Sequence, residues 1–277
     1  MQRALVLGGG GVTGVAWELG LLAGLVERGV PVTGADLVVG TSAGSMVGAQ
    51  VCSGLPVQRF YEEQLAPPSG EAAARLGVVA LARLVWAGGR TRDELRARAR
   101  IGAMALAART QSEASRRAVI EARLAAREWP ARRLLVTAVD AITGEFVVFD
   151  SDSGVSLVDA VGASCAVPGV WPPVTIGARR FVDGGMRSTV NADLAAGAQR
   201  VLVLAPTSAA FGPMPRLSAQ VDELRAGGST VVVVTPDAAA RTAIGRNVLD
   251  PARRAGAARA GRTQADAVAD EVSALWG

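Results

Sequence analysis

The segment Val38–Ala49, with the sequence VVGTSAGSMVGA, carries a run of apolar residues directly into a run of small ones. Within it, Gly40, Ser42 and Gly44 have the G-x-S-x-G spacing of a nucleophile elbow, a tight turn from a strand into a helix that exposes a serine hydroxyl. Small residues beside the serine relieve the crowding of such a turn. We therefore predict that Ser42 is a candidate nucleophile at a strand end, the alternative being a serine that only caps a helix.

Apolar runs and helical patterns alternate on both sides of this turn. Such alternation is typical of an α/β protein with a mostly parallel sheet covered by helices. The sequence predicts strands at residues 3–7, 35–39, 134–139, 145–149, 180–182, 201–204 and 230–234, and helices at about 14–28, from 43, at 156–165 and from about 251.

Residues 56–128 differ because they have helical patterns without a convincing strand. Thr91 and Glu94 have capping-box spacing, which predicts a helix start there. In the same region, the apolar run Leu76–Trp86 is either a core helix or a segment that touches a membrane surface. Neither an internal repeat nor an interdomain linker is evident. We interpret the chain as one domain, residues 1–277, with a helical insertion at about 56–128 and C-terminal strands and a helix at 200–277.

The composition limits the classes of protein to consider. Half of the residues are hydrophobic, which argues against a disordered chain. The sequence lacks a compact module of basic and aromatic residues, so we do not expect nucleic acid as a partner. The apolar window 4–25 contains four consecutive glycines and Glu18, which argues against a signal peptide. The sequence has no uninterrupted run of about 20 apolar residues, so we do not expect a membrane-spanning helix. We expect a soluble, cytoplasmic protein.

Between Arg90 and Arg133, arginines clearly outnumber acids. This excess predicts either a solvated helical face or a surface that attracts anionic lipid, which would make the protein peripheral to a membrane. Cys52 and Cys165 lie far apart among small apolar residues and are predicted to be buried free thiols. The chain has no histidine and no calcium-loop spacing of acids, so we expect neither a metal nor another cofactor.

The glycine run Gly8–Gly14 follows a predicted strand and precedes a predicted helix. Glycines bring backbone N–H groups close to a ligand, and a helix N-terminus favours negative charge there. The spacing also fits a dinucleotide fingerprint, which needs an acidic residue at the end of the second strand. Here Asp36 lies at the beginning of that strand. We therefore favour an anion-binding loop, with a dinucleotide site and a purely structural turn as alternatives.

A serine nucleophile needs a base, and this chain cannot supply the usual histidine. A carboxylate is the plausible substitute. Asp183 follows a predicted strand and precedes Gly184 and Gly185, so its side chain can be aimed into a site. By itself this segment is also compatible with an ordinary turn. Asp140 and Asp159 lack such a glycine setting and are predicted to cap or terminate elements.

These pieces together resemble the patatin-like phospholipase family. The resemblance covers about residues 4–195 and is carried by Gly8–Gly14, Gly40–Ala49, Ala163–Pro173 and Phe181–Gly185. It implies a three-layer α/β/α sandwich around a mostly parallel sheet. It also implies a catalytic dyad, with Ser42 as nucleophile and Asp183 as base, and an oxyanion hole. The implied hole is formed by the backbone N–H groups of Gly10, Gly11 and Thr13, and the motif glycines are Gly9, Gly14, Gly40, Gly44, Gly184 and Gly185.

The function that the resemblance implies is hydrolysis of carboxylic ester bonds in lipids, phospholipids or lysophospholipids, through an acyl-Ser42 intermediate. The expected partner is a lipid ester, reached by transient contact with a membrane surface. We expect the helical segment at about 56–128, with Leu76–Trp86, to cover its acyl chain. A free aspartate with a pKa of about 3.9 is a weak base at neutral pH, so the dyad requires a partly desolvated Asp183 in short contact with Ser42. We expect a pH–rate profile without an imidazole limb, and a limb near 6.5 would count against the dyad unless a perturbed carboxylate caused it. The chain has Thr13 where the family usually has arginine or lysine. A weak or inactive lipid-binding protein on the same fold is therefore the alternative.

Overall fold

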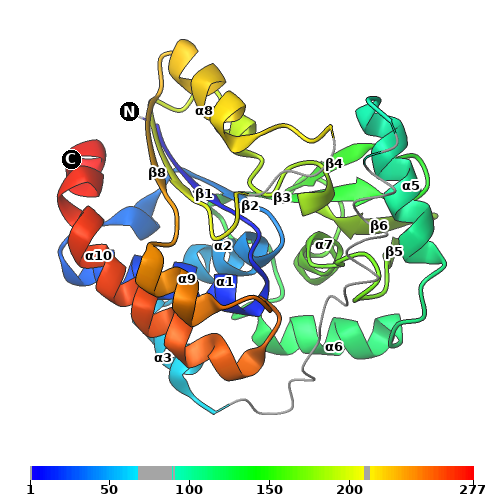
Figure 1. The fold of residues 1–277 in the computed structure, drawn as a ribbon, viewed down its shortest axis with the longest axis horizontal. Helices are drawn as coiled ribbons and strands as arrows, with labels where there is room; N and C mark the ends of the chain where they lie inside the picture. The colour runs from blue at the N-terminus through cyan, green and yellow to red at the C-terminus, as the bar shows by residue number, and fades with distance from the viewer. Residues whose placement is uncertain (1, 68–88, 90, 209–212) are drawn as a thin grey trace.

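A computed structural model describes residues 2–67, 89, 91–208 and 213–277 of the chain (Figure 1). The apolar run Leu76–Trp86 lies outside the described residues. The described part of 56–128 contains helices, as the sequence predicts.

The strands form one sheet in the order β5-β6-β3-β2-β1-β7-β8, with β4 paired to β3. Five neighbouring strands are parallel, namely β1 (Arg3–Leu7), β2 (Leu37–Gly40), β3 (Arg133–Asp140), β7 (Arg200–Leu204) and β8 (Thr230–Val234). The antiparallel pairings involve β4 (Phe146–Phe149), β5 (Val174–Ile176) and β6 (Arg179–Asp183).

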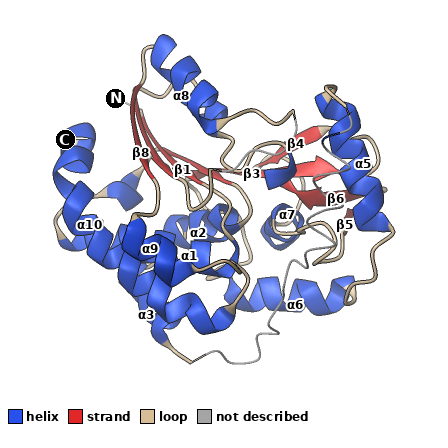
Figure 2. Ribbon diagram, viewed as in Figure 1, coloured by secondary structure: helices blue, strands red, loops and turns tan. Residues whose placement is uncertain are grey.

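Helices cover both faces of this sheet, so the predicted mostly parallel three-layer α/β/α fold is confirmed (Figure 2). One face packs against α1 (Gly11–Glu27), α2 (Ala43–Cys52), α7 (Leu157–Ser164), α9 (Ala238–Ile244) and α10 (Arg254–Trp276). The other face packs against α5 (Glu94–Leu106), α8 (Leu217–Ala226) and the short helix η3 (Ala192–Ala195). Helices α3 (Val57–Leu65) and α6 (Glu113–Arg123) pack on other helices.

The two cores follow from the alternation of side chains along each strand. On β1, Leu5 and Leu7 belong to the core under α1 and α10, whereas Ala4 and Val6 belong to the core under α8. Helices α1 and α10 approach closely because glycine stands at their contact. A Cβ at Gly20 would lie 2.0 Å from the carbonyl oxygen of Ala258.

Several element boundaries differ from the predictions. Helix α1 begins at Gly11 rather than at residue 14, since the left-handed φ of 61° at Gly11 turns the chain directly into the helix. Helix α5 is capped by Asp93, which accepts a hydrogen bond from the N–H of Arg96, and not by Thr91. Strand β5 and helices α8 and α9 were not predicted. Among the described residues, no helix is both long and apolar enough to cross a membrane.

The sheet brings the glycine loop, the turn at Ser42 and Asp183 to one end of its strands. Strands β1 and β2 are adjacent and parallel, so the glycine loop after β1 and the turn after β2 lie at the same end of the sheet. Gly40 pairs with Val136 on β3, and Ala138, two residues further on, pairs with Asp183 of the antiparallel β6. Ser42 lies two residues past Gly40, so Asp183 reaches the same end of the strands as Ser42.

Helix α1 carries a buried acid, Glu18, behind the glycine loop. Its side chain is fully buried, and within the described residues neither carboxylate oxygen has a hydrogen-bond partner. Burial raises the pKa of this carboxyl well above its ordinary value, and the nearby backbone of Gly8 offsets only part of the rise. Folding therefore favours the protonated form of Glu18.

We predict that Glu18→Gln raises Tm by at least about 2 °C at pH 8 and changes it much less at pH 4. A carboxyl whose pKa rises on folding contributes its full share of stability below the unfolded pKa. That share is lost as the pH rises through the folded pKa, and the amide removes this loss. Thermal unfolding of both proteins at the two pH values is the measurement. An equal change of Tm at both pH values would show that ionisation is not the cause.

Candidate active site

Ser42 sits on a strained turn between β2 and α2. Its φ of 53° and ψ of −116° lie outside the regions that side-chain-bearing residues prefer. The flanking glycines are required by close packing. A Cβ at Gly40 would lie 2.5 Å from the Cα of Ser45, and one at Gly44 would lie 2.0 Å from the carbonyl oxygen of Leu7. These contacts explain why the elbow is built from small residues.

The backbone of Ser42 is held in place by polar partners. Its N–H donates to the hydroxyl oxygen of Ser164 at 2.9 Å. Its carbonyl oxygen accepts hydrogen bonds from Ser45 Oγ at 2.7 Å and from Cys165 Sγ at 3.2 Å. Because buried backbone groups are costly when unpaired, these contacts help to stabilise the strained turn.

The structure brings Ser42 and Asp183 together. The Ser42 hydroxyl donates to Asp183 Oδ2 at 2.7 Å, and Asp183 Oδ1 accepts from the N–H of Gly185 at 2.7 Å. Asp183 is only 2% exposed. Burial raises the pKa of Asp183 to about 7, while its hydrogen bonds to Ser42 and Gly185 act in the opposite direction. The carboxylate is therefore a far stronger base than an ordinary aspartate.

Glycines after Asp183 let the chain turn away behind the carboxylate. A Cβ at Gly184 would lie 2.2 Å from Thr137 Oγ1 on β3, so a larger residue would push the segment off the sheet. Asp140 ends β3, as predicted, whereas α7 is capped by Ser156 and not by Asp159. Asp140 accepts from the N–H groups of Ile142 and Thr143 after β3, and Asp159 accepts from Ser156 and Arg117 at the start of α7.

The glycine loop lies beside Ser42. A Cβ at Gly9 would be 3.5 Å from the Cβ of Ser42, and the N–H of Gly9 donates to the carbonyl oxygen of Thr189. The N–H groups of Gly10 and Gly11 have no hydrogen-bond acceptor among the described residues. They are the first donors of the α1 N-terminus, and a Cβ at Gly10 would lie 2.5 Å from the side chain of Pro206.

Thr13 departs from the predicted oxyanion role. Its N–H donates to the carbonyl oxygen of Val248 at 3.1 Å, and its hydroxyl donates to the same oxygen at 3.2 Å. The residue is fully buried. Thr13 therefore anchors the segment before α10, and its N–H is already occupied. Val12, one residue earlier, lines the cavity at Ser42, and its N–H has no acceptor in the described part of the chain.

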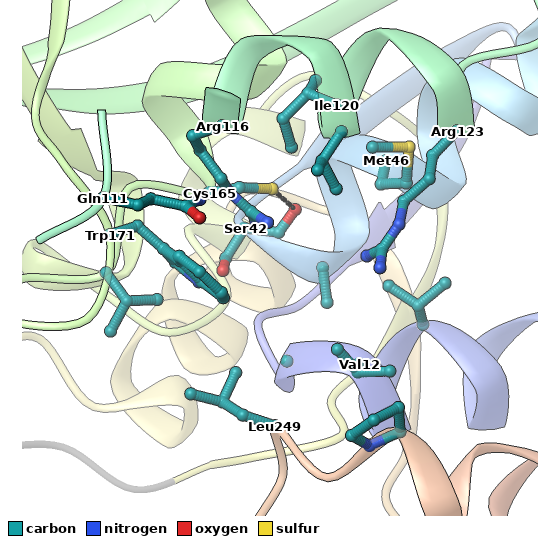
Figure 3. A pocket seen from close by; sticks show the side chains of 16 residues that line it. Val12, Ser42, Met46, Gln111, Arg116, Ile120, Arg123, Cys165, Trp171 and Leu249 are labelled. Carbon is teal, nitrogen blue, oxygen red and sulfur yellow. Dashed lines mark hydrogen bonds between the residues drawn. The ribbon is translucent and has the colours of Figure 1, made fainter. Parts of the chain in front are cut away.

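A cavity of about 130 Å³ opens over Ser42 (Figure 3). Helix α6 forms one wall, with Arg116, Ile120 and Arg123 pointing inward, and the opposite wall carries Val12 and Leu249. Most of the remaining lining is apolar, and the residues involved are Val15, Ala43, Met46, Val119, Val167, Trp171 and Pro251.

The sequence alone did not identify several residues that surround Ser42. Ser164 and Trp171 lie within the segment 163–173 that carries the family resemblance, but no spacing rule assigned them a role. Arg116 belongs to the predicted arginine excess, and its burial beside the cavity depends on the packing of α6 on α7. Both cysteines are free, as predicted; Cys52 is buried, whereas Cys165 is partly exposed at the cavity wall.

Comparisons with known proteins bear on this arrangement. A family model described as patatin-like phospholipase matches residues 5–196. A search of curated protein sequences gave no match. Among solved structures, VipD from Legionella pneumophila is similar, with a TM-score of 0.50 and 13% identity over 98% of this chain and 67% of that chain. The type III effector protein ExoU has a TM-score of 0.43 and 17% identity over 98% of this chain and 53% of that chain.

The likeness to VipD supports the fold alone, since the identity is low. The family match extends over more than half of the chain and includes the glycine loop, the elbow at Ser42 and the segment with Asp183. This protein belongs to the patatin-like phospholipase family.

Proposed function

We propose that this protein is a serine acyl hydrolase that cleaves a carboxylic ester bond of a phospholipid or lysophospholipid with a Ser42–Asp183 dyad. The observation that carries the proposal is the 2.7 Å hydrogen bond from the Ser42 hydroxyl to a buried carboxylate in a chain without histidine. Lipid acyl hydrolysis also agrees with the family to which the chain belongs. The substrate is reached by transient contact of a cytoplasmic protein with a membrane surface.

In the first half of the reaction, Ser42 Oγ attacks the acyl carbon of the ester while its proton passes to Asp183 Oδ2. The tetrahedral intermediate then loses the alcohol, which takes the proton from Asp183. In the second half, water attacks acyl-Ser42 and gives a proton to the same carboxylate. Collapse returns that proton to Ser42 and releases the fatty acid.

Negative charge on the substrate oxygen is met at the N-terminus of α1. The N–H groups of Gly10 and Gly11 are the proposed donors, as the sequence predicts. Val12 replaces Thr13 as the third, because the N–H of Thr13 donates to Val248. One oriented donor of this kind is worth about 3 kcal/mol of transition-state stabilisation. The partial positive charge of the helix end acts in the same direction.

A specific observation also favours the second candidate function, a weak or inactive lipid-binding protein. The family usually places arginine or lysine where this chain has Thr13, and here the threonine is buried against the segment before α10. The apolar cavity over Ser42 would then hold a lipid without turnover. The two functions differ in whether Ser42 forms a covalent adduct.

We predict that Ser42→Ala abolishes both labelling by a fluorophosphonate and hydrolysis of p-nitrophenyl butyrate. Asp183→Asn should lower kcat/KM at least about 10³-fold, because the amide cannot accept the proton. Circular dichroism and thermal unfolding of each variant control for folding. Equal turnover by all three proteins would remove both residues from the mechanism. A natural protein that neither labels nor turns over would favour the lipid-binding alternative.

We predict that kcat/KM for p-nitrophenyl butyrate rises with pH through a single limb at about 7, since burial raises the pKa of Asp183 to about 7. Such a limb comes from a perturbed carboxylate and not from an imidazole, which agrees with the desolvated Asp183 that the sequence predicts. Only the carboxylate accepts a proton, so activity falls below the pKa, by about 100-fold at pH 5. A profile flat from pH 5 to 9, in a protein that labels at Ser42, would exclude Asp183 as the titrating base.

A further inference from the structure

Arg116 is a buried cation beside Ser42. Only 9% of the residue is exposed, and its Nε has no hydrogen-bond partner in the part of the chain that the structure describes. Its guanidinium lies over the ring of Trp171, 4.0 Å from the ring centre. Both side chains line the cavity over Ser42 (Figure 3). A guanidinium over an aromatic ring is held by a cation–π interaction, which leaves its N–H groups able to donate to an acceptor.

The acids on and near α6 are engaged elsewhere. Glu113 accepts hydrogen bonds from the N–H and hydroxyl of Thr175. Glu121 pairs with Arg117 and Arg127, and Asp159 pairs with Arg117. Within the described residues, no ion pair involves Arg116.

A second cation, Arg123, lies near Arg116. Burial lowers the pKa of its guanidinium to about 10, with a further lowering from the nearby Arg123, while the Cys165 thiol acts in the opposite direction. Arg123 lines the same cavity, on the same helix. An anion placed between these side chains would offset the cost of desolvating Arg116.

Resting on the function proposed above, we propose that Arg116 binds the anionic phosphodiester of the lipid ester substrate and sets a preference for substrates that carry one. The guanidinium fork matches two phosphate oxygens, which a carbonyl group does not offer. Arg116 is on the α6 wall, across Ser42 from Val12 on α1, so it faces a different part of the substrate from the oxyanion donors (Figure 3). Arg116 thereby supplies a positive charge near Ser42 in a chain that has the uncharged Thr13 where the family usually has arginine or lysine.

The test compares two substrates below their micellar concentrations, dihexanoyl phosphatidylglycerol and dihexanoylglycerol, which share acyl chains and differ in the phosphodiester. For Arg116→Gln, the ratio of kcat/KM for the charged over the neutral ester should fall about 10- to 100-fold, mostly through KM. Arg116→Lys should restore part of the ratio, because it keeps the charge but loses the fork. Arg117→Gln removes the adjacent charge, which pairs with Asp159, and should leave the ratio unaltered.

An equal loss on both esters would overturn the proposal, because Arg116 would then serve the reacting carbonyl or only the packing of α6. An unchanged ratio in Arg116→Gln would overturn it as well. The released fatty acid is a second anion that Arg116 could bind, and inhibition of each variant by hexanoate tests for it. If Arg116→Gln relieves hexanoate inhibition and leaves the ratio unaltered, the residue holds the released fatty acid rather than the phosphodiester, against the proposal.

A binding experiment separates this inference from the proposed chemistry. Calorimetric titration of Ser42→Ala with dihexanoyl phosphatidylglycerol needs no turnover. We expect Ser42→Ala/Arg116→Gln to bind it at least about tenfold more weakly, with the affinity for dihexanoylglycerol changing less. If the natural protein hydrolyses neither ester while the titration shows this difference, the hydrolase function fails and the anion site stands. Equal affinities in the titration would overturn the anion site whatever the activity.

Discussion

In the proposed mechanism a carboxylate takes the proton of Ser42, and an aspartate of ordinary pKa would be too weak a base at neutral pH. The fold removes this difficulty by excluding water from Asp183. Desolvation raises the pKa of its carboxyl to about 7, although two hydrogen bonds favour the charged form. Other features of the site serve this pairing. Antiparallel β6 carries Asp183 to the edge reached by β2, and the glycines that follow let the carboxylate be buried.

Much of this arrangement was predictable because close backbone contacts restrict the residue type. Tight contacts with backbone or with neighbouring side chains leave room only for small residues at Gly40 and Gly184, beside two strand ends, and at Gly10 and Gly11 in the glycine loop. Such positions leave a spacing signature in the sequence. The sequence also displays an alternation of strands and helices, which predicts the parallel pairing of β1 with β2 and of β2 with β3.

The parts that could not be predicted depend on contacts distant in sequence. The N–H of Thr13 is occupied by Val248, and nothing local to the glycine loop indicates that partner. Arg116 and Ser164 acquire their positions only when α6 and α7 pack over the elbow. The sequence predicts that Asp183 must be partly desolvated to act as a base, but not how far its pKa is raised, since desolvation is set by the whole of the surrounding core rather than by neighbours in the chain.

Two buried groups that can carry opposite charges, Asp183 and Arg116, lie close to Ser42, and no ion pair joins them in the part of the chain that the structure describes. The pKa of Asp183 is shifted by burial and by its bonds to Ser42 and Gly185, and no guanidinium is among the causes in the described residues. A cation in contact with Asp183 would lower that pKa and weaken the base. Arg116 is instead held over Trp171. In the proposed mechanism this contact holds the positive charge at the cavity without pairing it to the carboxylate, so that Asp183 accepts a proton and Arg116 binds an anion.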